Sequence, residues 1–427
     1  MKTYWTIGST AAIALLMMTG CGSTPSSDTV SGATPDEPVE LTYWYAWGDK
    51  IGENNENLVA QFNEEHPTIQ VTAEFQGTYD ELHAKTQAAF AAKDAPEVTQ
   101  NEIASVETFA KNGMTQSLQP FIDADGLDIE DFNEGLMGNS YVEDEIYALP
   151  YLRSTPILYL NTTILEEKGL DPAGPKTWDE FKEYAAVLSE DGTMKGATMP
   201  IDIWFYEAFV TQAGGTMIDE DGQPAFNSEA GAEAIDFIKE MYEEGSIKVP
   251  TGDVAGDTAK QDFVNGKSGM MLSSTADLTY LMTNAKEQGY EVDTAFMPEN
   301  KQFGVPTGGA NLVMTAGLDE VKQEAAWTFI KWMTDTDQTA YASEFTGYLP
   351  SRHSASETEA MQKVYEEVPQ YKTAVDQLEY AHERPMVEGY PEVVNALVEE
   401  ITRAVLQDGT SQDALDNAEK RAEAVLK

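Results

Sequence analysis

The side chains with the most chemical potential in this sequence are aromatic rings and small polar groups at the ends of expected strands and helices. Aromatic faces pack on the C–H faces of polyols and sugars, and a few directed hydroxyl, carboxylate and amide groups fix the orientation of such a molecule. The pattern therefore favours a small-molecule cleft, although Trp204 or Tyr348 taken singly fits a hydrophobic core better. The candidates are Tyr79, Glu102, Ser154, Trp204, Ser274, Gly309 with its neighbour Gly308, Tyr348 and Arg384.

Signatures of catalysis are mostly absent. The four histidines lie far apart, and none forms the His-Glu-x-x-His pair of a zinc hydrolase: His66, His83, His353 and His382. The 74 acidic residues are so abundant that some pair always lies at the spacing of a glycoside hydrolase, so that signal has no specificity. We expect no catalytic residue, no metal site and no cofactor. An exported glycoside hydrolase is the alternative from another functional class.

Two short motifs imitate ligand loops but lack required residues. The segment 265–268 ends like a phosphate-binding loop, yet position 261 is Gln where that motif needs Gly, so we interpret Gly266 as a helix C-cap. The segment 219–222 resembles part of a calcium loop, yet its first and last ligand positions hold Met217 and Ser228. A surface hairpin turn is the better interpretation of that segment.

The amino terminus predicts export. Lys2 precedes an apolar run from Ile7 to Met18, which is too short to span a bilayer and is typical of a signal peptide over residues 1–20. The small residues before Cys21 resemble the lipobox of bacterial lipoproteins, in which this thiol is acylated after cleavage. The alternative is an ordinary secretory signal with an incidental cysteine. Cys21 is the only cysteine, so no disulfide forms within one chain.

Composition divides the rest of the chain into a tether and a folded body. Residues 21–38 contain almost no large apolar side chain and cannot offset their ordering entropy, so we expect a flexible tether. About 390 residues follow, which is too long for one ordinary core and favours two lobes. The net charge of −48 argues against a nucleic-acid partner, because phosphates are bound by patches of Lys and Arg.

Hydrophobic patterning predicts an α/β fold with parallel strands. The body opens with a β-branched and aromatic strand over residues 39–47, an amphipathic helix over 54–66 and a second strand over 68–75. The order strand, helix, strand implies parallel pairing. Thr177 and Glu180 predict a capped helix start. Further strands are expected at 97–99, 147–150 and 156–161, and further helices at 79–92, 103–111, 203–213, 229–244, 258–265, 319–334 and 390–406.

The collinear order of several short motifs resembles the extracellular solute-binding proteins of carbohydrate-type ABC importers, and within them the glycerol-3-phosphate-binding branch. The resemblance covers nearly the whole chain after the tether. Its motifs are Leu41 to Trp44, Gly77 to Tyr79, Ala95 to Val98, Ser154 to Asn161, Gly169 to Pro172, Lys176 to Trp178, Gly308 to Leu312, Thr346 to Pro350 and Gln412 to Leu415.

The resemblance implies a two-lobe, type II periplasmic-binding-protein-like fold with a hinge and an interlobe cleft. The hinge crossings are then expected near residues 154–158, 304–312 and 347–350. Lobe 1 is expected to contain residues 39–155 and 308–347, and lobe 2 residues 156–307 and 348–427. Hinge closure on a ligand presents a surface to the membrane permease. The implied protein is a monomer, lipid-anchored at the outer face of the cell membrane, whose partners are a small-molecule ligand and the permease subunits of an ABC importer.

The same resemblance assigns ligand contacts to the eight candidates named above. Arg384 matters most for ligand identity, because a guanidinium holds a phosphate by two parallel hydrogen bonds. The alternative is a surface Arg384 paired with Glu383 or Glu388. Arg153 departs from the branch, which commonly has Asn or Ser there. Glycerol 3-phosphate or a related phosphodiester is therefore the expected ligand, and a neutral oligosaccharide is the alternative. A chemoreceptor or adhesin partner without a permease would share the fold.

Overall fold

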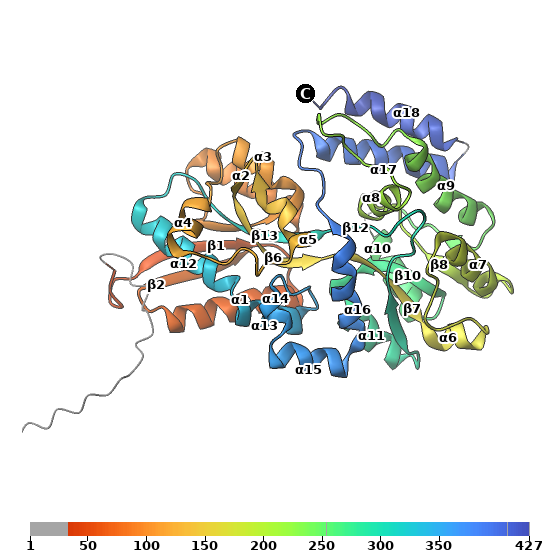
Figure 1. Cartoon of the computed structure of the whole chain (residues 1–427), viewed down its shortest axis with the longest axis horizontal. Coiled ribbons are helices and arrows are strands. Elements are labelled where there is room, and N and C mark those ends of the chain that lie inside the picture. Colours follow the sequence, from red (N-terminus) through yellow and green to blue (C-terminus); the bar gives the residue numbers. More distant parts are fainter. Residues whose placement is uncertain (1–32, 253, 408, 427) are drawn as a thin grey trace, which may run out of the picture.

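The computed structural model describes residues 33–252, 254–407 and 409–426. The expected signal peptide, residues 1–20, and Cys21 lie outside these ranges, and only residues 33–38 of the expected tether lie within them. Figure 1 shows two halves side by side, each with its own β-sheet, joined by several chain segments at the centre. Over the described residues, no helix combines the length and apolar character needed to cross a bilayer.

The first sheet has the strand order β2-β1-β3-β13-β6. Its strands are β1 (Val39–Tyr45), β2 (Ile69–Phe75), β3 (Val98–Glu102), β6 (Ala148–Ser154) and β13 (Gly308–Met314). The predicted parallel pairing is confirmed for β1 with β2 and β3. The prediction is incomplete for the sheet as a whole, since β13 runs antiparallel to both β3 and β6. β13 enters from the second half of the molecule and therefore inserts in the opposite direction.

The second sheet has the strand order β11-β7-β10-β8-β9 and is also mixed. Its strands are β7 (Pro156–Asn161), β8 (Lys195–Thr198), β9 (Ile247–Lys248), β10 (Ser268–Ser274) and β11 (Val292–Ala295). β7 runs antiparallel to β10 and β11, whereas β8 is parallel to its neighbours. Two small pairs complete the strands: β4 (Tyr141–Val142) with β5 (Glu145–Ile146), and β12 (Val305–Pro306) with β14 (Ala381–His382).

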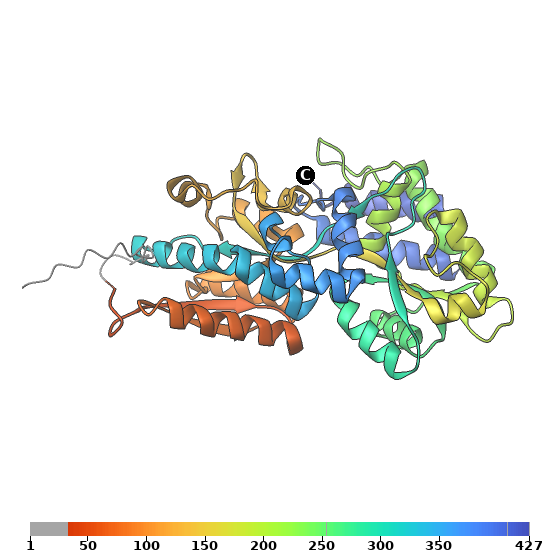
Figure 2. The same cartoon turned by 60° about the horizontal axis from the view of Figure 1, so that its bottom comes forward.

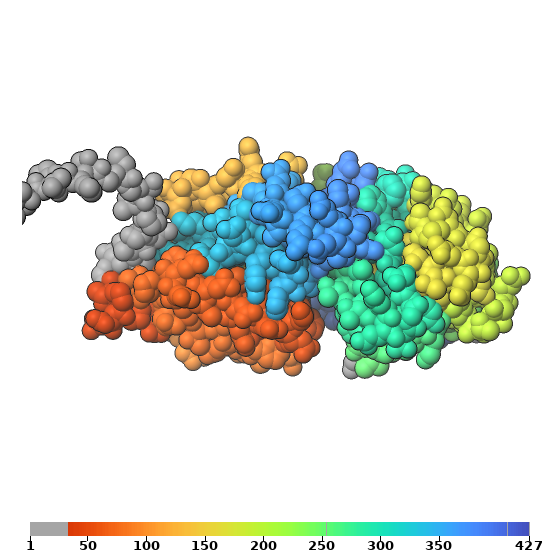
Figure 3. All heavy atoms as spheres, turned by 90° about the horizontal axis from the view of Figure 1, so that it is seen from below, coloured from red at the N-terminus to blue at the C-terminus, as the bar shows by residue number. Residues whose placement is uncertain are grey.

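Helices flank both sheets and also span the junction. The first half contains α1 (Asp49–Glu65), α2 (Tyr79–Ala92), α3 (Val106–Lys111), α4 (Gln119–Asp125), α12 (Glu320–Met333) and α13 (Thr336–Thr346). The second contains α6 (Thr162–Glu167), α7 (Trp178–Ser189), α8 (Ile203–Gln212), α9 (Glu229–Glu243), α10 (Ala255–Val264), α11 (Leu278–Glu287), α17 (Tyr390–Leu406) and α18 (Ser411–Ala422). Between them lie α5 (Glu134–Met137), α14 (His353–Ser356), α15 (Glu359–Glu367) and α16 (Pro369–Asp376). Figures 2 and 3 show the blue stretch around α14 to α16 at the junction of the halves.

Each sheet buries its own hydrophobic core. In the first half, Tyr43, Phe62 and Phe329 meet edge to face, and the ring centroids of Tyr43 and Phe329 lie 5.3 Å apart. In the second half, Trp178 stacks on Phe237 with centroids 4.5 Å apart. A third apolar cluster joins elements of the junction to the second sheet, with Leu136, Leu349 and Tyr371 against Tyr159.

Several local predictions are confirmed, and two need correction. α2 spans the predicted residues, Gly266 follows the end of α10 with a left-handed φ of 67°, and residues 218–224 form a turn closed by an Ile218–Pro224 bridge. α1 begins at Asp49, earlier than predicted. Thr177 caps α7 as expected. In a capping box the Glu180 carboxylate would accept from the Thr177 N–H, but here it accepts from the N–H of the preceding residue, Lys176.

The chain passes from the first sheet to the second at Thr155, since β6 ends at Ser154 and β7 begins at Pro156. Arg153 and Ser154, expected between two strands, are instead the last residues of β6. The Leu349 N–H donates to the Arg153 carbonyl oxygen at 2.8 Å, so the 347–350 segment lies beside this crossing. These contacts occur where hinge crossings are expected, and the exact division into two lobes stays a prediction.

Candidate ligand-binding site

Local structure brings candidate side chains to the ends of strands and the starts of helices near the junction. Tyr79 begins α2 directly after a capping box formed by Thr78 and Glu81. Glu102 ends β3, and its carboxylate accepts from the Ala104 N–H at 3.1 Å. Trp204 lies in the first turn of α8, which Asp202 caps. Ligands of open α/β sheets bind at such carboxyl ends of strands.

Arg384 forms an ion-paired bridge between the halves. Its Nε and Nη2 donate to the two carboxylate oxygens of Glu207 on α8, at 2.9 and 3.1 Å. Its Nη1 donates to Glu102 on the first sheet at 3.2 Å. Burial lowers the pKa of Arg384, but Glu207 and Glu102 raise it by more, so the guanidinium stays charged. The alternative pairing with Glu383 or Glu388 is not the one observed.

The Arg384 segment is also fixed through its backbone. The side-chain amide of Asn139 accepts from the Arg384 N–H at 3.0 Å and donates to the Arg384 carbonyl oxygen at 2.9 Å. The Tyr390 hydroxyl donates to Glu207 at 2.7 Å. Arg384 uses three of its five N–H donors on carboxylates, so two donors on Nη1 and Nη2 are left for another acceptor.

Tyr79, Glu102 and Tyr348 form a close group beside this ion pair. Burial raises the pKa of Tyr79 well above its usual value, and the nearby Tyr348 and Glu102 raise it further. Burial also raises the pKa of Tyr348, to about 12. The Tyr79 hydroxyl oxygen is buried and has no hydrogen-bond partner of acceptable geometry. Neutral phenols facing a carboxylate can donate to, and accept from, the hydroxyl groups of a ligand.

Trp204, Ser154 and the glycine pair form a second group at the crossing. The Trp204 indole N–H donates to the Thr307 carbonyl oxygen at 3.0 Å, and its ring lies against Gly308. Gly308 pairs with Ser154 across the sheet, and Gly309 pairs with Arg153. Gly309 has φ of +94°, and a Cβ there would lie 1.9 Å from the Leu152 carbonyl oxygen. Only glycine fits this position, so its role includes backbone geometry.

Ser274 reaches the same region from the second sheet. It ends β10, and its hydroxyl accepts from the Ala276 N–H at 3.2 Å. The Ala276 carbonyl oxygen lies close to Gly347, the residue before Tyr348. The eight candidates are therefore distributed over both halves, and Ser274 makes no hydrogen bond or ring contact with the other seven side chains among the described residues.

Arg153 lies beneath this site as a fully buried cation. Its side chain is 0% exposed and donates to the Gly308 and Leu136 carbonyl oxygens, the Asn311 side chain and the Thr307 hydroxyl, at 2.6 to 3.0 Å. Burial lowers its pKa to about 9, against the influence of Glu102, so it is protonated at neutral pH. The residue that departs from the branch pattern thus fixes the crossing strand by four hydrogen bonds.

Sequence reasoning missed two side chains of the site. Glu207 had no motif to mark it, because its role depends on the distant Arg384. Trp47 is 38% exposed, and its ring meets the Tyr79 ring edge to face at 5.4 Å. Its φ of 66° is an outlier for a bulky residue, and such strain concentrates at functional sites. An aromatic residue at a strand end, directly before Gly48, was the available signal.

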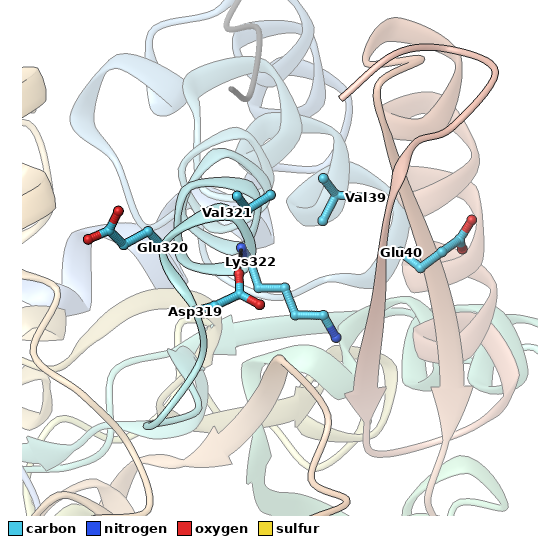
Figure 4. A pocket seen from close by; sticks show the side chains of 6 residues that line it. All are labelled: Val39, Glu40, Asp319, Glu320, Val321 and Lys322. Atoms are coloured by element: carbon cyan, nitrogen blue, oxygen red, sulfur yellow. Dashed lines mark hydrogen bonds between the residues drawn. The ribbon is translucent and has the colours of Figure 1, made fainter. Parts of the chain in front are cut away.

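A separate hollow lies away from the candidate site. It has a volume of about 630 Å³ and is lined by Val39, Glu40 and residues 319–322 (Figure 4). These residues lie at the amino-terminal end of β1, opposite the edge that carries Tyr79 and Glu102. Lys322 points toward the sheet and is paired with Glu97, so the described residues that line the hollow offer no unpaired cation. We do not assign it a function.

We expect a Glu102→Gln variant to be less sensitive to pH than the wild type. Burial raises the pKa of Glu102 above its usual 4.5, with Arg384 opposing. A carboxyl group whose folded pKa is raised costs stability as pH rises from about 4.5 through that pKa, so the variant should lack this loss. Thermal unfolding from pH 4 to 8 measures it, with the exposed Glu64→Gln as control. An unchanged pH profile in Glu102→Gln would contradict the expectation.

The sequence profile of a family described as bacterial extracellular solute-binding protein matches residues 57–372. The sn-glycerol-3-phosphate-binding periplasmic protein UgpB of Pectobacterium atrosepticum is 25% identical over 414 residues, covering 91% of each chain. UgpB of Escherichia coli K12 is 25% identical over 412 residues, covering 91% of this chain and 92% of its own.

Solved structures share the fold. UgpB of Mycobacterium tuberculosis, in complex with glycerophosphocholine, has a TM-score of 0.80 and 24% identity, covering 91% of this chain and 98% of its own. The GacH receptor of Streptomyces glaucescens, which was also solved with acarbose, has a TM-score of 0.79 and 22% identity, covering 91% and 98%. At these identities the likeness establishes the two-lobe fold.

Proposed function

The chain belongs to the family of bacterial extracellular solute-binding proteins, and we propose from this membership that it captures a polyol phosphate or a carbohydrate for an ABC importer. Its relatives and fold neighbours are binding proteins, and this chain is likewise a binding protein and not an enzyme. The observation that carries the ligand class is the junction between the sheets, where tyrosines, a tryptophan, a carboxylate and a guanidinium meet.

For the ligand itself we propose a glycerol phosphate ester, with glycerol 3-phosphate first. Arg384 supports this choice, because two of its N–H donors are left after Glu207 and Glu102 are paired. Phosphate oxygens accept from such a pair of donors. Tyr79, Glu102 and Ser154 would bind the glycerol hydroxyls, with Trp204 against the carbon chain. The two UgpB relatives are sn-glycerol-3-phosphate-binding proteins, which agrees with this class.

A neutral oligosaccharide is the second candidate, and one observation favours it. Arg384 faces two carboxylates, Glu207 and Glu102, so the negative charge around the guanidinium exceeds its single positive charge. A phosphate must bind against this excess, whereas a neutral sugar need not. The GacH receptor and a cyclic α-maltosyl-1,6-maltose-binding protein from Arthrobacter globiformis share the fold.

We propose that binding closes the two halves around the crossings near Thr155, Thr307 and Leu349. A ligand that contacts Glu102 in one half and Trp204 in the other stabilises the arrangement in which both are close, by its differential affinity for that state. The closed form would then be recognised by the permease. We further propose that the protein acts as a monomer.

We propose that acylated Cys21 anchors the protein at the outer face of the membrane, through a tether over residues 21–38. A Cys21→Ser variant is then expected to appear in the culture medium, while the wild type sediments with membranes. Fractionation and immunoblotting measure the distribution. A Ser variant that stays with membranes would refute acylation at this residue.

Ligand screening by thermal shift tests the proposed function. A ligand at 100 times its Kd stabilises the folded state by roughly 2.7 kcal/mol, which raises the unfolding midpoint by several degrees. We expect this rise with glycerol 3-phosphate or glycerophosphodiesters. A rise with maltose-type or xylose-type oligosaccharides alone would replace the phosphate assignment. No rise with any polyol, sugar or phosphate ester would refute the function.

A further inference from the structure

A small polar cavity lies next to the candidate site, between the first sheet and the helices that cover it. Its volume is about 10 Å³, which is close to the room that one water molecule needs. Residues of α2, β3 and α3 line it: Tyr79, Leu82, His83, Thr86, Gln100, Asn101, Glu102 and Phe109. Two of these residues, Tyr79 and Glu102, belong to the proposed ligand site.

The polar groups around the cavity include an orphaned amide. Asn101 is 4% exposed, yet neither its side-chain oxygen nor its side-chain nitrogen has a hydrogen-bond partner among the residues that the structure describes. Asn101 pairs with Asn311 on β13, so both side chains lie on the same face of the sheet. The Asn311 amide is satisfied by Arg153, Asn139 and Ser140, and it offers nothing to Asn101.

Burying an amide without partners costs several kcal/mol, and native proteins satisfy such groups with ordered water when space and other polar groups allow. Both conditions hold here. The Tyr79 hydroxyl is likewise buried and makes no well-aligned hydrogen bond among the described residues, although Tyr348 and Trp47 lie close to it. The Thr86 hydroxyl donates to the Leu82 carbonyl oxygen at 2.8 Å and keeps its own lone pairs free for a donor.

We propose that this cavity binds one ordered water molecule, which the Asn101 amide holds. This water braces Tyr79, in the sense that it keeps the Tyr79 side chain in its ligand-binding orientation. Asn101 is thus a positioning residue that acts through water and does not touch the ligand. The cavity is too small for a glycerol ester or a sugar ring. The water site itself is independent of the proposed function, whereas its effect on affinity rests on that function.

A crystal structure of the protein at a resolution that shows ordered waters tests the site directly. We expect one water within hydrogen-bond distance of the Asn101 amide in the cavity beneath α2. An empty cavity, or an Asn101 amide bonded only to protein atoms, would overturn the proposal. This result does not depend on which ligand the protein binds, so it is distinguishable from a failure of the proposed function.

An Asn101→Leu variant tests the bracing. Leu has the same branching and number of heavy atoms as Asn, is somewhat larger and has no polar atoms. We therefore expect the water to be lost and the affinity for glycerol 3-phosphate, or for the ligand that the screen finds, to fall about tenfold by calorimetry. The unfolding midpoint should change little, because the buried amide and the water that satisfies it are removed together. Unaltered affinity in a variant that has lost the water would overturn the bracing role.

Asn63→Leu is the matched control. Asn63 lies in α1, and its side chain exchanges two hydrogen bonds with the backbone of Val71, far from the carboxyl ends of the strands. Its replacement should lower the unfolding midpoint and leave the affinity unchanged. If the two variants instead lose affinity in proportion to lost stability, Asn101 is merely structural and the proposal is wrong.

Discussion

An Arg384→Gln variant is expected to lose binding of glycerol 3-phosphate by at least 100-fold. Arg384 is the guanidinium that joins Glu102 of the first sheet to Glu207 of α8, with one N–H on Nη1 and one on Nη2 not used by these carboxylates. Hydrogen bonds to charged groups contribute about 1.5–3 kcal/mol each, and two such bonds account for this loss. Isothermal titration calorimetry measures it. A neutral oligosaccharide should lose at most a few-fold.

Stability must be separated from binding in this experiment. Glu207 is 1% exposed, and removing its partner leaves a buried carboxylate unpaired, which typically costs about 3–5 kcal/mol. The double variant Arg384→Gln, Glu207→Gln removes both charges and can keep an amide–amide hydrogen bond. We expect it to fold and still not bind the phosphate ester. A folded double variant that binds glycerol 3-phosphate like the wild type would remove Arg384 from the site.

An Arg153→Ala variant is expected to be the most destabilised single substitution near the junction, by about 3–5 kcal/mol. The side chain is fully buried, and its loss leaves four acceptors without donors on Leu136, Thr307, Gly308 and Asn311. Each unsatisfied buried group costs about 1–3 kcal/mol. The substitution also removes the free-energy cost of burying the Arg153 charge, which has no carboxylate within ion-pair distance among the described residues, but the four lost hydrogen bonds outweigh this gain. Urea unfolding monitored by circular dichroism measures the change.

Two further variants make the Arg153 expectation decisive. Arg403→Met removes an arginine that is half exposed and paired with Glu400, so it should change stability by less than about 1 kcal/mol. Thr307→Val removes only one of the four acceptors and should cost about 1 kcal/mol. This milder variant still tests the hydrogen bonds of Arg153 in the event that Arg153→Ala does not fold. A stable Arg153→Ala protein, within about 1 kcal/mol of the wild type, would contradict the view that this cation fixes the crossing strand.

Local patterns were sufficient for much of the fold. The helix over Tyr79–Ala92 was expected from the sequence pattern, and the turn at residues 219–222 was expected from its acidic residues and glycine. Patterns could not give the direction of β13, since strand direction depends on where the chain has come from and not on its own residues. They also could not place Arg153 within β6, because a fully buried arginine is indistinguishable in sequence from one in a polar loop.

The candidate site divides in the same way. Residue type and a family resemblance selected Tyr79, Glu102 and Arg384, because aromatic, carboxylate and guanidinium groups have the chemistry that a polyol or phosphate needs. The partnership of Arg384 with Glu207 joins residues 177 positions apart, and the orphaned amide of Asn101 is visible only once its neighbours are known. Sequence by itself determined which groups were present and which elements would carry them. Only the tertiary structure decided which charges neutralise one another and which polar atoms are left unpaired, because both depend on burial and on contacts between distant segments.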